Sequence, residues 1–562
     1  MRTCGSPGST RSPGRPSAGS RWHRAPDPER AALYCRRPGS WGKKPRFRAA
    51  GPSAWWGLVG AEALGVAISE FSPAFIEAFN RGAALFQAGR FDEAAEAFRR
   101  LAEEHPGVAN LHGNLGLCLH AAGRPAEAME PLRQALRLRP AYPDALNALG
   151  GILLDQHNYE HALIAFRELA RLKPDHPGAL LTLGNLFMFT GDAERARTAY
   201  RFALTVEPDV AVNYNNLGAV SLSLGFPPEA ALHYRRALAI DVGKPEYRKN
   251  LGTCLLMAGD YPNGTVAYEG RLEQGVWRKR NMPGVLWQGQ PLEGRTLLVH
   301  FEQGLGDSFQ YIRYAGVLKR MGARVLYECQ PALKRVLSTA PDLDGLFAFG
   351  EPLPAYDYYI SLMSLMHRLG TTPDNVPGGV PYIRAEAEPA ARWAERLERL
   401  EGGRRPRLRV GINWHGNETG KSIPLECFEA MGRLPGVRLY SLQKVSGLAH
   451  LERLRDRVAV TELGADFDAG PDAFLDTAAV MANLDLVITC DTSVCHLAGA
   501  MGRPTWVVLK WFADWRWMRD RLDSPWYPTM RLFRQATSND WPEVMARVTA
   551  EVAALSATEG GR

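Results

Sequence analysis

A strict internal period limits what this chain can fold into more than any other feature of its sequence. Between residues 82 and 252 a glycine returns every 34 residues, with a small residue twelve positions later and a large apolar residue four positions after that. The glycines are Gly82, Gly116, Gly150, Gly184, Gly218 and Gly252, the small residues Ala94, Ala128, Ala162, Ala196, Ala230 and Gly264, and the large ones Phe98, Leu132, Phe166, Tyr200, Tyr234 and Tyr268. Small residues let two helices approach closely and the large residue fills the gap, so the period predicts repeated helix pairs.

Prolines near the ends of the first four repeats are suited to end the second helix of each pair; they are Pro106, Pro140, Pro174 and Pro208. The pattern matches the tetratricopeptide repeat over about 200 residues. One such unit cannot bury its apolar face alone, so we expect residues 75–278 to stack six repeats into a superhelix, an α-solenoid with a concave groove. The last repeat departs from the pattern at Gly264 and Arg271, which predicts a unit that caps the solenoid and joins it to the C-terminal half of the chain.

The groove of such a solenoid is a docking surface, and we expect it to hold a protein or peptide partner. The alternative is that the repeats only support the neighbouring domain.

Residues 1–68 have a different composition. The first 60 residues are rich in Arg, Pro, Ser and Gly, and too poor in apolar residues to build a core. They are interpreted either as a disordered basic tail or as a mis-assigned extension from a start codon placed too far upstream. Twelve Lys/Arg against two carboxylates give these 60 residues a charge of +10, so the chain total of +7 leaves −3 for the rest. The folded part is therefore not basic, and nucleic acid is not an expected partner.

The cysteines bear on the compartment. Eight are scattered along the chain without a CxxC pair, which fits neither a disulfide framework nor a zinc site and indicates a reducing, cytoplasmic location. No run of about 18 apolar residues occurs, so no transmembrane segment is expected. The apolar stretch Ala54–Ile68 contains Glu62 and lies far from Met1, which argues against a signal peptide.

After about residue 290 the pattern changes to short apolar runs separated by helical stretches. The predicted strands are Thr296–Phe301, Arg324–Glu328, Gly345–Phe349, Asp357–Ile360, Leu408–Trp414, Val437–Leu442, Leu486–Thr489 and Thr505–Leu509. A charged helical stretch at residues 385–407 divides them into two sets. Strands that alternate with helices predict parallel sheets covered on both faces. We therefore expect an α/β fold of two Rossmann-like lobes, residues 291–390 and 405–550, with a cleft between them.

The first candidate site comes directly after the first of these strands, at Glu302–Asp307. Gly304 and Gly306 let backbone N–H groups approach a ligand at a helix N-terminus, where the dipole favours negative charge. A tight turn also needs glycine, and Asp307 can equally be a residue that caps the helix.

The second candidate comes after the strand Leu486–Thr489. Asp491, Thr492, Ser493 and His496 lie where the strand ends and a helix opens, which is where open α/β sheets bind ligands. The hydroxyl groups and the free N–H groups of the helix suit a diphosphate. The alternative is an ordinary helix cap with a packed histidine.

The third candidate is the segment Asn413–Gly416 followed by Lys421–Pro424, in which Lys421 and Ser422 precede a predicted helix near Pro424. Lys421 is able to neutralise a phosphate as a point charge, although a lone loop lysine is usually solvated. Tryptophans also gather late in the chain. They are interpreted either as a sugar or acceptor subsite, with Trp414, Trp515 and Trp517 as candidates, or as core.

These motifs, in this order, resemble the inverting glycosyltransferases of the GT-B fold over residues 291–534. The resemblance is strongest to the heptosyltransferase family and to bacterial proteins that fuse tetratricopeptide repeats to such a domain, and is more distant to the protein O-linked N-acetylglucosamine transferases. The matching positions are Gly306-Asp307, Lys421 with Pro424, Asp491-Thr492-Ser493 with His496, and the segments 514–517 and 523–528. Ser493 departs from the glycine that heptosyltransferases usually have there.

The resemblance implies roles for these residues. Asp307 would be the general base that takes the acceptor's proton, while Lys421 and the helix start at Thr492 and Ser493 would stabilise the nucleoside-diphosphate leaving group. Asp491 or His496 would orient the phosphates or the ribose. The strand end that includes Gln443 would lie near the base. Neither a metal nor a cofactor is implied, since the nucleotide-sugar is a co-substrate.

The sequence supports two functions of different classes. The first is an active, metal-independent glycosyltransferase of hexosyl- or heptosyl-type, whose acceptor, a protein, is recruited by the solenoid. The second is a non-catalytic repeat scaffold with a degenerate transferase-like domain. A lipopolysaccharide-type acceptor is a third interpretation, which a peptide groove disfavours.

Overall fold

The computed structural model describes residues 71–274, 282–377, 379–416 and 420–558. The expectations for residues 1–68 and for the last residues of the 75–278 segment lie outside these ranges. All described residues belong to one compact unit, Lys44–Arg562.

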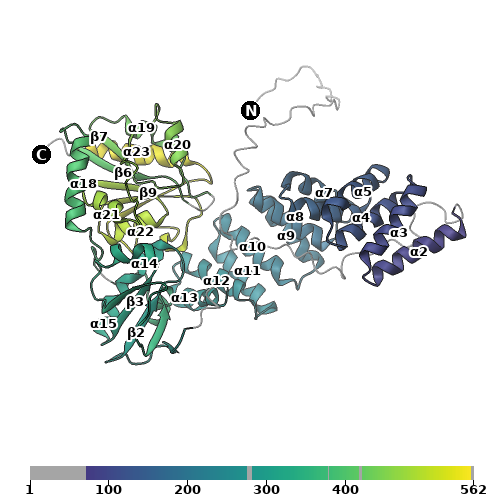
Figure 1. Cartoon of the computed structure of the whole chain (residues 1–562), viewed down its shortest axis with the longest axis horizontal. Helices are drawn as coiled ribbons and strands as arrows, with labels where there is room; N and C mark the ends of the chain where they lie inside the picture. The colour runs from purple at the N-terminus through teal and green to yellow at the C-terminus, as the bar shows by residue number, and fades with distance from the viewer. Residues whose placement is uncertain (1–70, 275–281, 378, 417–419, 559–562) are drawn as a thin grey trace, which may run out of the picture. The chain divides into compact units, whose positions relative to one another are not determined.

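The first part of the described chain consists of paired helices that follow the 34-residue period (Figure 1). The pairs are α2 (Pro73–Gln87) with α3 (Phe91–Glu104), α4 (Ala109–Ala121) with α5 (Pro125–Leu138), α6 (Pro143–Asp155) with α7 (Tyr159–Leu172), α8 (Pro177–Phe189) with α9 (Ala193–Val206), α10 (Ala211–Ser223) with α11 (Pro227–Ile240), and α12 (Pro245–Met257) with α13 (Tyr261–Tyr268). This is the predicted solenoid of six helix pairs.

The repeated glycines lie where the two helices of a pair touch. A Cβ atom added at Gly184 would come within 2.4 Å of the Tyr200 ring, and one added at Gly116 within 2.6 Å of Leu132. Only glycine leaves room for the large side chain of the second helix, as the period predicted. The small residue of that helix, such as Ala128, is fully buried.

The sixth pair differs from the others in the length of its second helix. Helix α13 spans 8 residues, whereas α11 spans 14, and a 3-10 segment η3 (Glu269–Glu273) replaces the missing turns. Arg271 lies in η3 and is buried. The two departures seen in the sequence thus mark the point where the solenoid ends.

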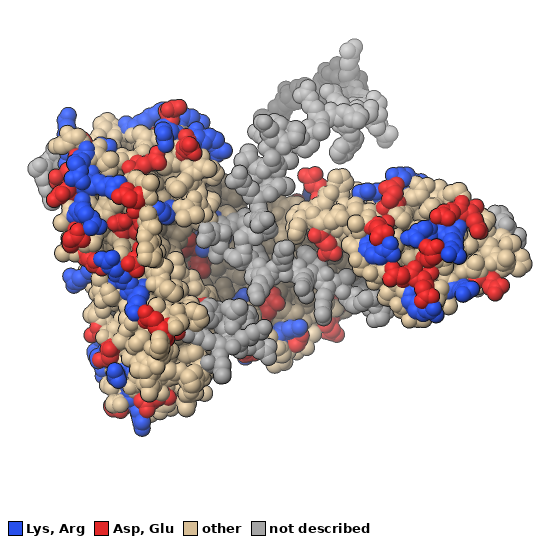
Figure 2. Space-filling view, viewed as in Figure 1, with Lys and Arg blue, Asp and Glu red and all other residues tan. Residues whose placement is uncertain are grey.

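The solenoid surface carries paired rather than segregated charges. Figure 2 shows Lys/Arg and Asp/Glu intermixed on the visible face of the repeats. Many are close pairs on one helix or its start, such as Arg124 with Glu127 at 2.7 Å and Arg171 with Glu168 at 2.6 Å. Exposed pairs of this kind each stabilise a protein by about 0–1 kcal/mol.

The first α/β region is built on a five-stranded, wholly parallel sheet in the order β1-β5-β2-β3-β4. Its strands are β1 (Val285–Leu286), β2 (Thr296–His300), β3 (Arg324–Cys329), β4 (Gly345–Ala348) and β5 (Tyr358–Ser361), and its helices are α14 (Leu305–Tyr311), α15 (Ala315–Arg320), α16 (Lys334–Leu337) and α17 (Leu365–Arg368). From β2 the chain moves to β3 and β4 on one side and returns to β5 on the other. The strand order therefore reverses between β2 and β5.

The second α/β region has a six-stranded parallel sheet in the order β11-β10-β9-β6-β7-β8. Its strands are β6 (Leu408–Asn413), β7 (Val437–Ser441), β8 (Val460–Thr461), β9 (Leu486–Cys490), β10 (Thr505–Leu509) and β11 (Met530–Arg534). Its helices are α18 (Ala387–Leu400), α19 (Glu429–Gly432), α20 (Leu448–Arg453), α21 (Leu475–Ala482), α22 (Ser493–Ala500) and α23 (Trp541–Thr558). Here the order reverses between β6 and β9.

Helices cover both faces of the second sheet, as the alternating sequence pattern predicted (Figure 1). On one face Val410 and Ile488 pack in a core with residues of α19, α20 and α23. On the other, Val487 and Val507 pack in a core with residues of α18, α21 and α22. The sequence missed the short strands β1 and β8 and the edge strand β11. Within the described ranges, no helix has both the length and the apolar character needed to cross a membrane.

Candidate functional site

Polar side chains meet at the carboxyl edge of the second sheet, where its strand order reverses. Asn413 ends β6, and Thr492 comes after β9 on the neighbouring strand. The Thr492 hydroxyl donates to Asn413 Oδ1 at 2.8 Å, and Asn413 Nδ2 donates to Gln443 Oε1, beyond β7, at 2.8 Å. A reversal of strand order opens a crevice in which parallel sheets bind ligands. The network ties together the three loops that border this crevice, and it includes Gln443 and Thr492 from the predicted set.

Lys421 lies beside this network and pairs with Asp491. Its Nζ is 2.9 Å from Asp491 Oδ2, and the two side chains are 14% and 10% exposed. The loop that carries Lys421 returns to the sheet because Ile423 N donates to Trp414 O at 2.8 Å. The structure thus brings together two residues that lie 70 positions apart in the sequence, and it shields the lysine from bulk water.

Ser422, a predicted nucleotide ligand, is occupied within its own loop. Its hydroxyl lies 3.0 Å from His415 Nδ1 and accepts from Gly416 N at 3.2 Å. It therefore shapes the loop that presents Lys421. Ser493 forms the first turn of α22, next to the cap residue Thr492.

His496 was predicted to face a phosphate or ribose, but the structure places it in a packing interface. It is 6% exposed, stacks on Trp517 with 5.5 Å between ring centroids, and has Nδ1 3.0 Å from the Tyr527 hydroxyl. Burial, assisted by the nearby Arg516 charge, lowers its pKa to about 3. The ring is therefore neutral near pH 7, and the alternative of a packed histidine describes it better than a ligand does.

The structure gives a different reason from the predicted one for the two glycines that precede Asp307. A Cβ atom at Gly306 would lie 2.7 Å from His496 Cδ2, so this glycine lets α14 pack closely on α22. The Gly304 N–H donates to Asp307 Oδ2 at 2.8 Å and is thus already occupied. The structure thus gives Gly304 a role in capping and Gly306 a role in helix packing, and an approach of backbone N–H groups to a phosphate here stays a prediction.

Asp307 lies in a cluster of buried charges between the two α/β regions. Its Oδ1 is 2.5 Å from Arg516 Nη2, and its side chain is 12% exposed. Arg516 also donates to Gln310 at 2.7 Å and, through Nη1, to Asp514 at 2.9 Å. One guanidinium therefore holds a carboxylate from each region.

Burial raises the pKa of Asp307, although the Arg516 charge works in the opposite direction. Burial would also raise the pKa of Asp514, but Arg516 and Lys421 outweigh it and hold that pKa below its ordinary value. Asp514 is the more accessible carboxylate, with a side chain 28% exposed. The pKa values of the two carboxylates are thus shifted in opposite directions, and Asp307 is the better proton acceptor of the two.

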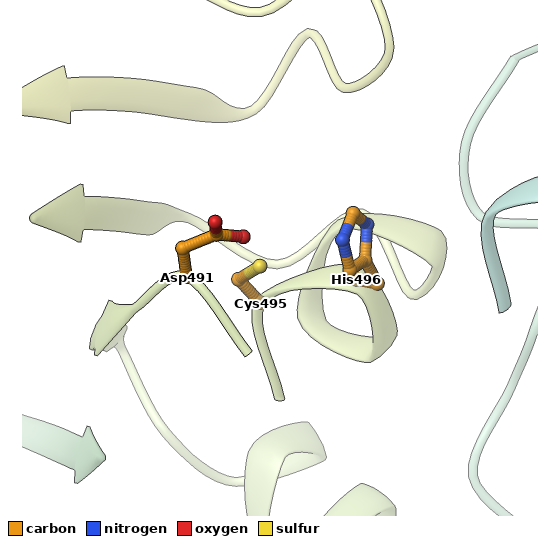
Figure 3. A group of neighbouring side chains, drawn as sticks. All are labelled: Asp491, Cys495 and His496. Atoms are coloured by element: carbon orange, nitrogen blue, oxygen red, sulfur yellow. The ribbon is translucent and has the colours of Figure 1, made fainter. Parts of the chain in front are cut away.

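One group of side chains has the residue types of a metal site. Of the residues that the structure describes, Asp491, Cys495 and His496 bring three potential ligand atoms within 4.8 Å of one another (Figure 3). Asp491 already pairs with the Lys421 cation, and burial raises the pKa of the Cys495 thiol well above its usual value. A neighbouring cation and a thiol that keeps its proton both oppose a metal ion, so this group fits one poorly.

The predicted aromatic subsite is not formed by the tryptophans that were named for it. Trp414, Trp515 and Trp517 are at most 2% exposed. Rings this deeply buried offer no face to a sugar, so their alternative interpretation as core residues is the better one.

Sequence reasoning named Asn413 in the third candidate motif, and Asp514 and Arg516 in the segment 514–517, but gave none of the three a role of its own. The signal for Asn413 was its place as the polar residue that ends the first strand of its region. The pairing of Arg516 with Asp307 spans 209 residues and leaves no local signal.

Comparison with known proteins identifies the repeats. The family model for the tetratricopeptide repeat matches residues 79–143, 132–177 and 181–245, all within helices α2–α12. The helix pairs from α2 to α11 are therefore tetratricopeptide repeats.

Protein FlbA of Caulobacter vibrioides is 26% identical over 320 residues, which make up 50% of this chain and 50% of FlbA. The chain thus spans about half the length of this curated relative. Among solved structures, MamA is 22% identical, with 31% of this chain and 94% of that chain covered and a TM-score of 0.29. PilF of Pseudomonas aeruginosa is 19% identical, with 36% and 90% covered and a TM-score of 0.31.

Proposed function

We propose that the two α/β regions form a GT-B glycosyltransferase that transfers a sugar from a nucleotide-sugar to an acceptor, with inversion and without a metal ion. Each of the two parallel sheets has a reversal of strand order, the topology at which α/β folds of this kind bind nucleotides and substrates. The observation that carries the proposal is Lys421 held beside the Asn413–Thr492–Gln443 network at the reversal point of the second sheet.

The chemistry at this edge suits a nucleoside diphosphate. Lys421 supplies a positive charge for the developing negative charge of the leaving group. An incoming phosphate would compete with Asp491 for the lysine and, in turn, leave that carboxylate available for ribose hydroxyls. The amide and hydroxyl groups of the network offer both donors and acceptors to the base and the sugar.

Asp307 is the residue that we assign as general base. Its raised pKa favours proton uptake, and each of its oxygens keeps acceptor capacity beyond the one bond described above. Arg516 orients it. The acceptor, by this proposal a protein, is recruited by the tetratricopeptide solenoid, whose repeats are a protein-interaction architecture.

The test is a thermal-shift and calorimetric panel of nucleoside diphosphates and nucleotide-sugars on the full chain. The wild-type protein should bind one base preferentially, and Lys421→Ala should weaken that binding at least tenfold. The matched control is Lys334→Ala, because this lysine also forms an ion pair, with Glu351, but lies in the first region. Silence across the panel from a folded protein would refute the proposal.

A non-catalytic scaffold remains the second candidate, and the burial of Asp307 under Arg516 is the observation that favours it. If the protein is a scaffold, the wild type, Asp307→Ala and Lys421→Ala should all capture the protein partner equally well. Slow hydrolysis of a nucleotide-sugar by the wild type, abolished in Asp307→Ala or Lys421→Ala, would exclude this function.

A further inference from the structure

The reversal point of the first sheet is filled by the solenoid. Glu302 comes after β2 and Ser361 ends β5, so the two residues border the position where the strand order turns. Arg271 of the sixth repeat inserts there and donates to both Glu302 oxygens, at 2.8 and 2.9 Å. The Arg271 and Glu302 side chains are 3% and 1% exposed. A crevice that commonly receives a ligand is thus closed by an arginine from the repeats.

This ion pair is part of a wider hydrogen-bonded group. Ser361 donates to Glu302, while Arg271 also donates to Ser364 at 2.8 Å and to Glu269 at 2.5 Å. Burial works to raise the pKa of Glu302, but the Arg271 charge outweighs it and lowers that pKa. Glu302 therefore stays ionised, and both of its oxygens are held.

The turn that begins at Glu302 leads directly to Asp307. The proposed base lies five positions after the anchored carboxylate, and the Gly304 N–H within the turn donates to Asp307. The position of Arg271 consequently fixes one side of the Asp307 environment.

A second set of contacts from the same repeat reaches the other side. The rings of Tyr261 and Tyr268 lie edge-on to Trp515, with centroid distances of 6.2 and 5.9 Å. Trp515 immediately precedes Arg516, which contacts Asp307 at 2.5 Å. The sixth repeat thus contacts both the turn that precedes Asp307 and the tryptophan next to Arg516, so two separate sets of its contacts act on the Asp307 carboxylate.

We propose that the sixth tetratricopeptide repeat is a built-in positioning element of the Asp307 site, in which Arg271 fixes the turn before Asp307 while Tyr261 and Tyr268 fix Arg516 beside it. The inference rests on the proposed function insofar as Asp307 is the reacting base. It gives the repeats a second task beside recruitment of the acceptor. The apolar core supports it, since residues of α12 and α13 share one cluster with β2, α14 and Trp515.

The variant that tests this is Arg271→Lys in the full chain. Lysine keeps the positive charge beside Glu302 but loses the planar fork that grips both oxygens, so the turn should loosen without an uncompensated buried charge. The matched control is Arg248→Lys in α12, because Arg248 pairs with Glu273 at the surface, where the two side chains are 43% and 54% exposed.

Hydrogen exchange measured by mass spectrometry gives a readout that needs no turnover. Arg271→Lys should exchange the amides of residues 302–311 and 512–518 roughly tenfold faster than wild type, while Arg248→Lys should match wild type. Tyr261→Leu, which removes the ring contact with Trp515 but keeps an apolar side chain in the core, should accelerate exchange mainly in residues 512–518. If both segments of Arg271→Lys exchange at the same rate as in the wild type, the proposal is overturned.

Kinetics supply the second readout. With the donor that the panel identifies, Arg271→Lys should lower kcat roughly 10- to 100-fold with little change in donor KM, because the base is displaced while Lys421 is untouched. The acid limb of the kcat profile should move to higher pH, since Arg516 lowers the pKa of Asp307 and its contact would weaken. A smaller folded fraction would lower the rate without moving that limb, so an unmoved limb counts against positioning.

The two proposals can fail separately. If the wild type binds no nucleotide-sugar, the transferase is refuted, while the exchange experiment still decides whether the sixth repeat holds the carboxylate cluster. If the wild type turns over and Arg271→Lys matches it in rate, pH profile and exchange, only the positioning role is refuted.

Discussion

The two ends of the solenoid share one sequence pattern but pack in different ways. The first repeats bury their apolar residues among themselves, in clusters that contain only repeat residues. The fifth and sixth repeats share their cluster with the first sheet, α22 and the buried tryptophans. We call the first repeats the free end and the fifth and sixth repeats the docked end. The surface of the free end carries exposed ion pairs, whereas the docked end buries Arg271 against Glu302. A repeat that stacks on its own kind thus needs only its period, whereas a repeat that ends on another fold needs specific polar partners.

The largest expected difference between the two ends comes from their arginines. Arg271→Met leaves Glu302 buried without its partner and should lower the free energy of unfolding by about 3–5 kcal/mol. Arg124→Met, in the second repeat, removes an exposed pair with Glu127 and should cost about 0–1 kcal/mol. Urea unfolding followed by circular dichroism compares the two. Equal costs would contradict the distinction between a docked and a free end.

The repeat glycines sharpen the comparison. A Cβ atom at Gly184 would press on the Tyr200 ring, which can shift, and Gly184→Ala should cost about 1–3 kcal/mol. At Gly252 the nearest atom is the Tyr268 backbone nitrogen at 2.4 Å, and this backbone is held by the docked end. Gly252→Ala should therefore cost more than Gly184→Ala in the same thermal unfolding series.

The matched control for both substitutions is Gly151→Ala in α6, where a Cβ atom would meet nothing within 4 Å. Alanine there should stabilise the helix by up to about 1 kcal/mol, through helix propensity. Destabilisation at this position would show that close packing is not the reason for the costs at the repeat glycines.

A smaller effect should depend on pH and arise in the shared core. His496 has its pKa lowered from 6.5 to about 3 by burial, so the unfolded chain takes up a proton that the native chain refuses. Its contribution to stability is complete above pH 6.5 and is lost as the pH falls toward 3, with a slope of up to about 1.4 kcal/mol per pH unit. Between pH 7 and pH 5 this amounts to about 2 kcal/mol at most. His496→Gln, which can still bond Tyr527, should flatten that part of the profile; an unchanged slope would mean that other groups, such as His120, dominate it.

The smallest effect is expected at the free surface. Arg171→Ala removes an exposed pair with Glu168 and should change the free energy of unfolding by less than about 1 kcal/mol, and by still less at high salt. Urea unfolding at low and high salt measures both values. A clear loss would mean that the surface pairs of the free repeats form a cooperative network.

The sequence alone predicted most of the architecture, and the physical reasons are local. The spacing of glycine and large apolar residues reports the contact inside each helix pair, so the six pairs and their ends could be read directly. Buried strands such as β6 and β9 appear as short apolar runs bounded by turns. The edge strand β11 was not predicted, because its short sequence does not distinguish a strand from a partly buried loop.

The candidate site was predictable only in part. Asp491 and Thr492 were named from a strand end, because parallel strands present their carboxyl ends at one edge of the sheet, while Lys421 was named from a loop before a predicted helix and Gln443 from the family resemblance. The structure reassigned His496, Gly304 and Gly306 to packing and capping. Sequence patterns do not distinguish a glycine that admits a ligand from one that admits a neighbouring helix, since both require the same missing Cβ atom.

The sequence by itself therefore determined everything set by short-range chemistry: the helix pairs, the alternation of strands and helices, and the positions where polar loops leave the sheets. Tertiary structure alone decided which of those polar residues meet. Arg271 reaches Glu302 across 31 residues and Arg516 reaches Asp307 across 209. Such pairs form because a charge taken out of water must find its counterpart wherever the packed core brings one, and the position of that counterpart along the chain leaves no periodic trace.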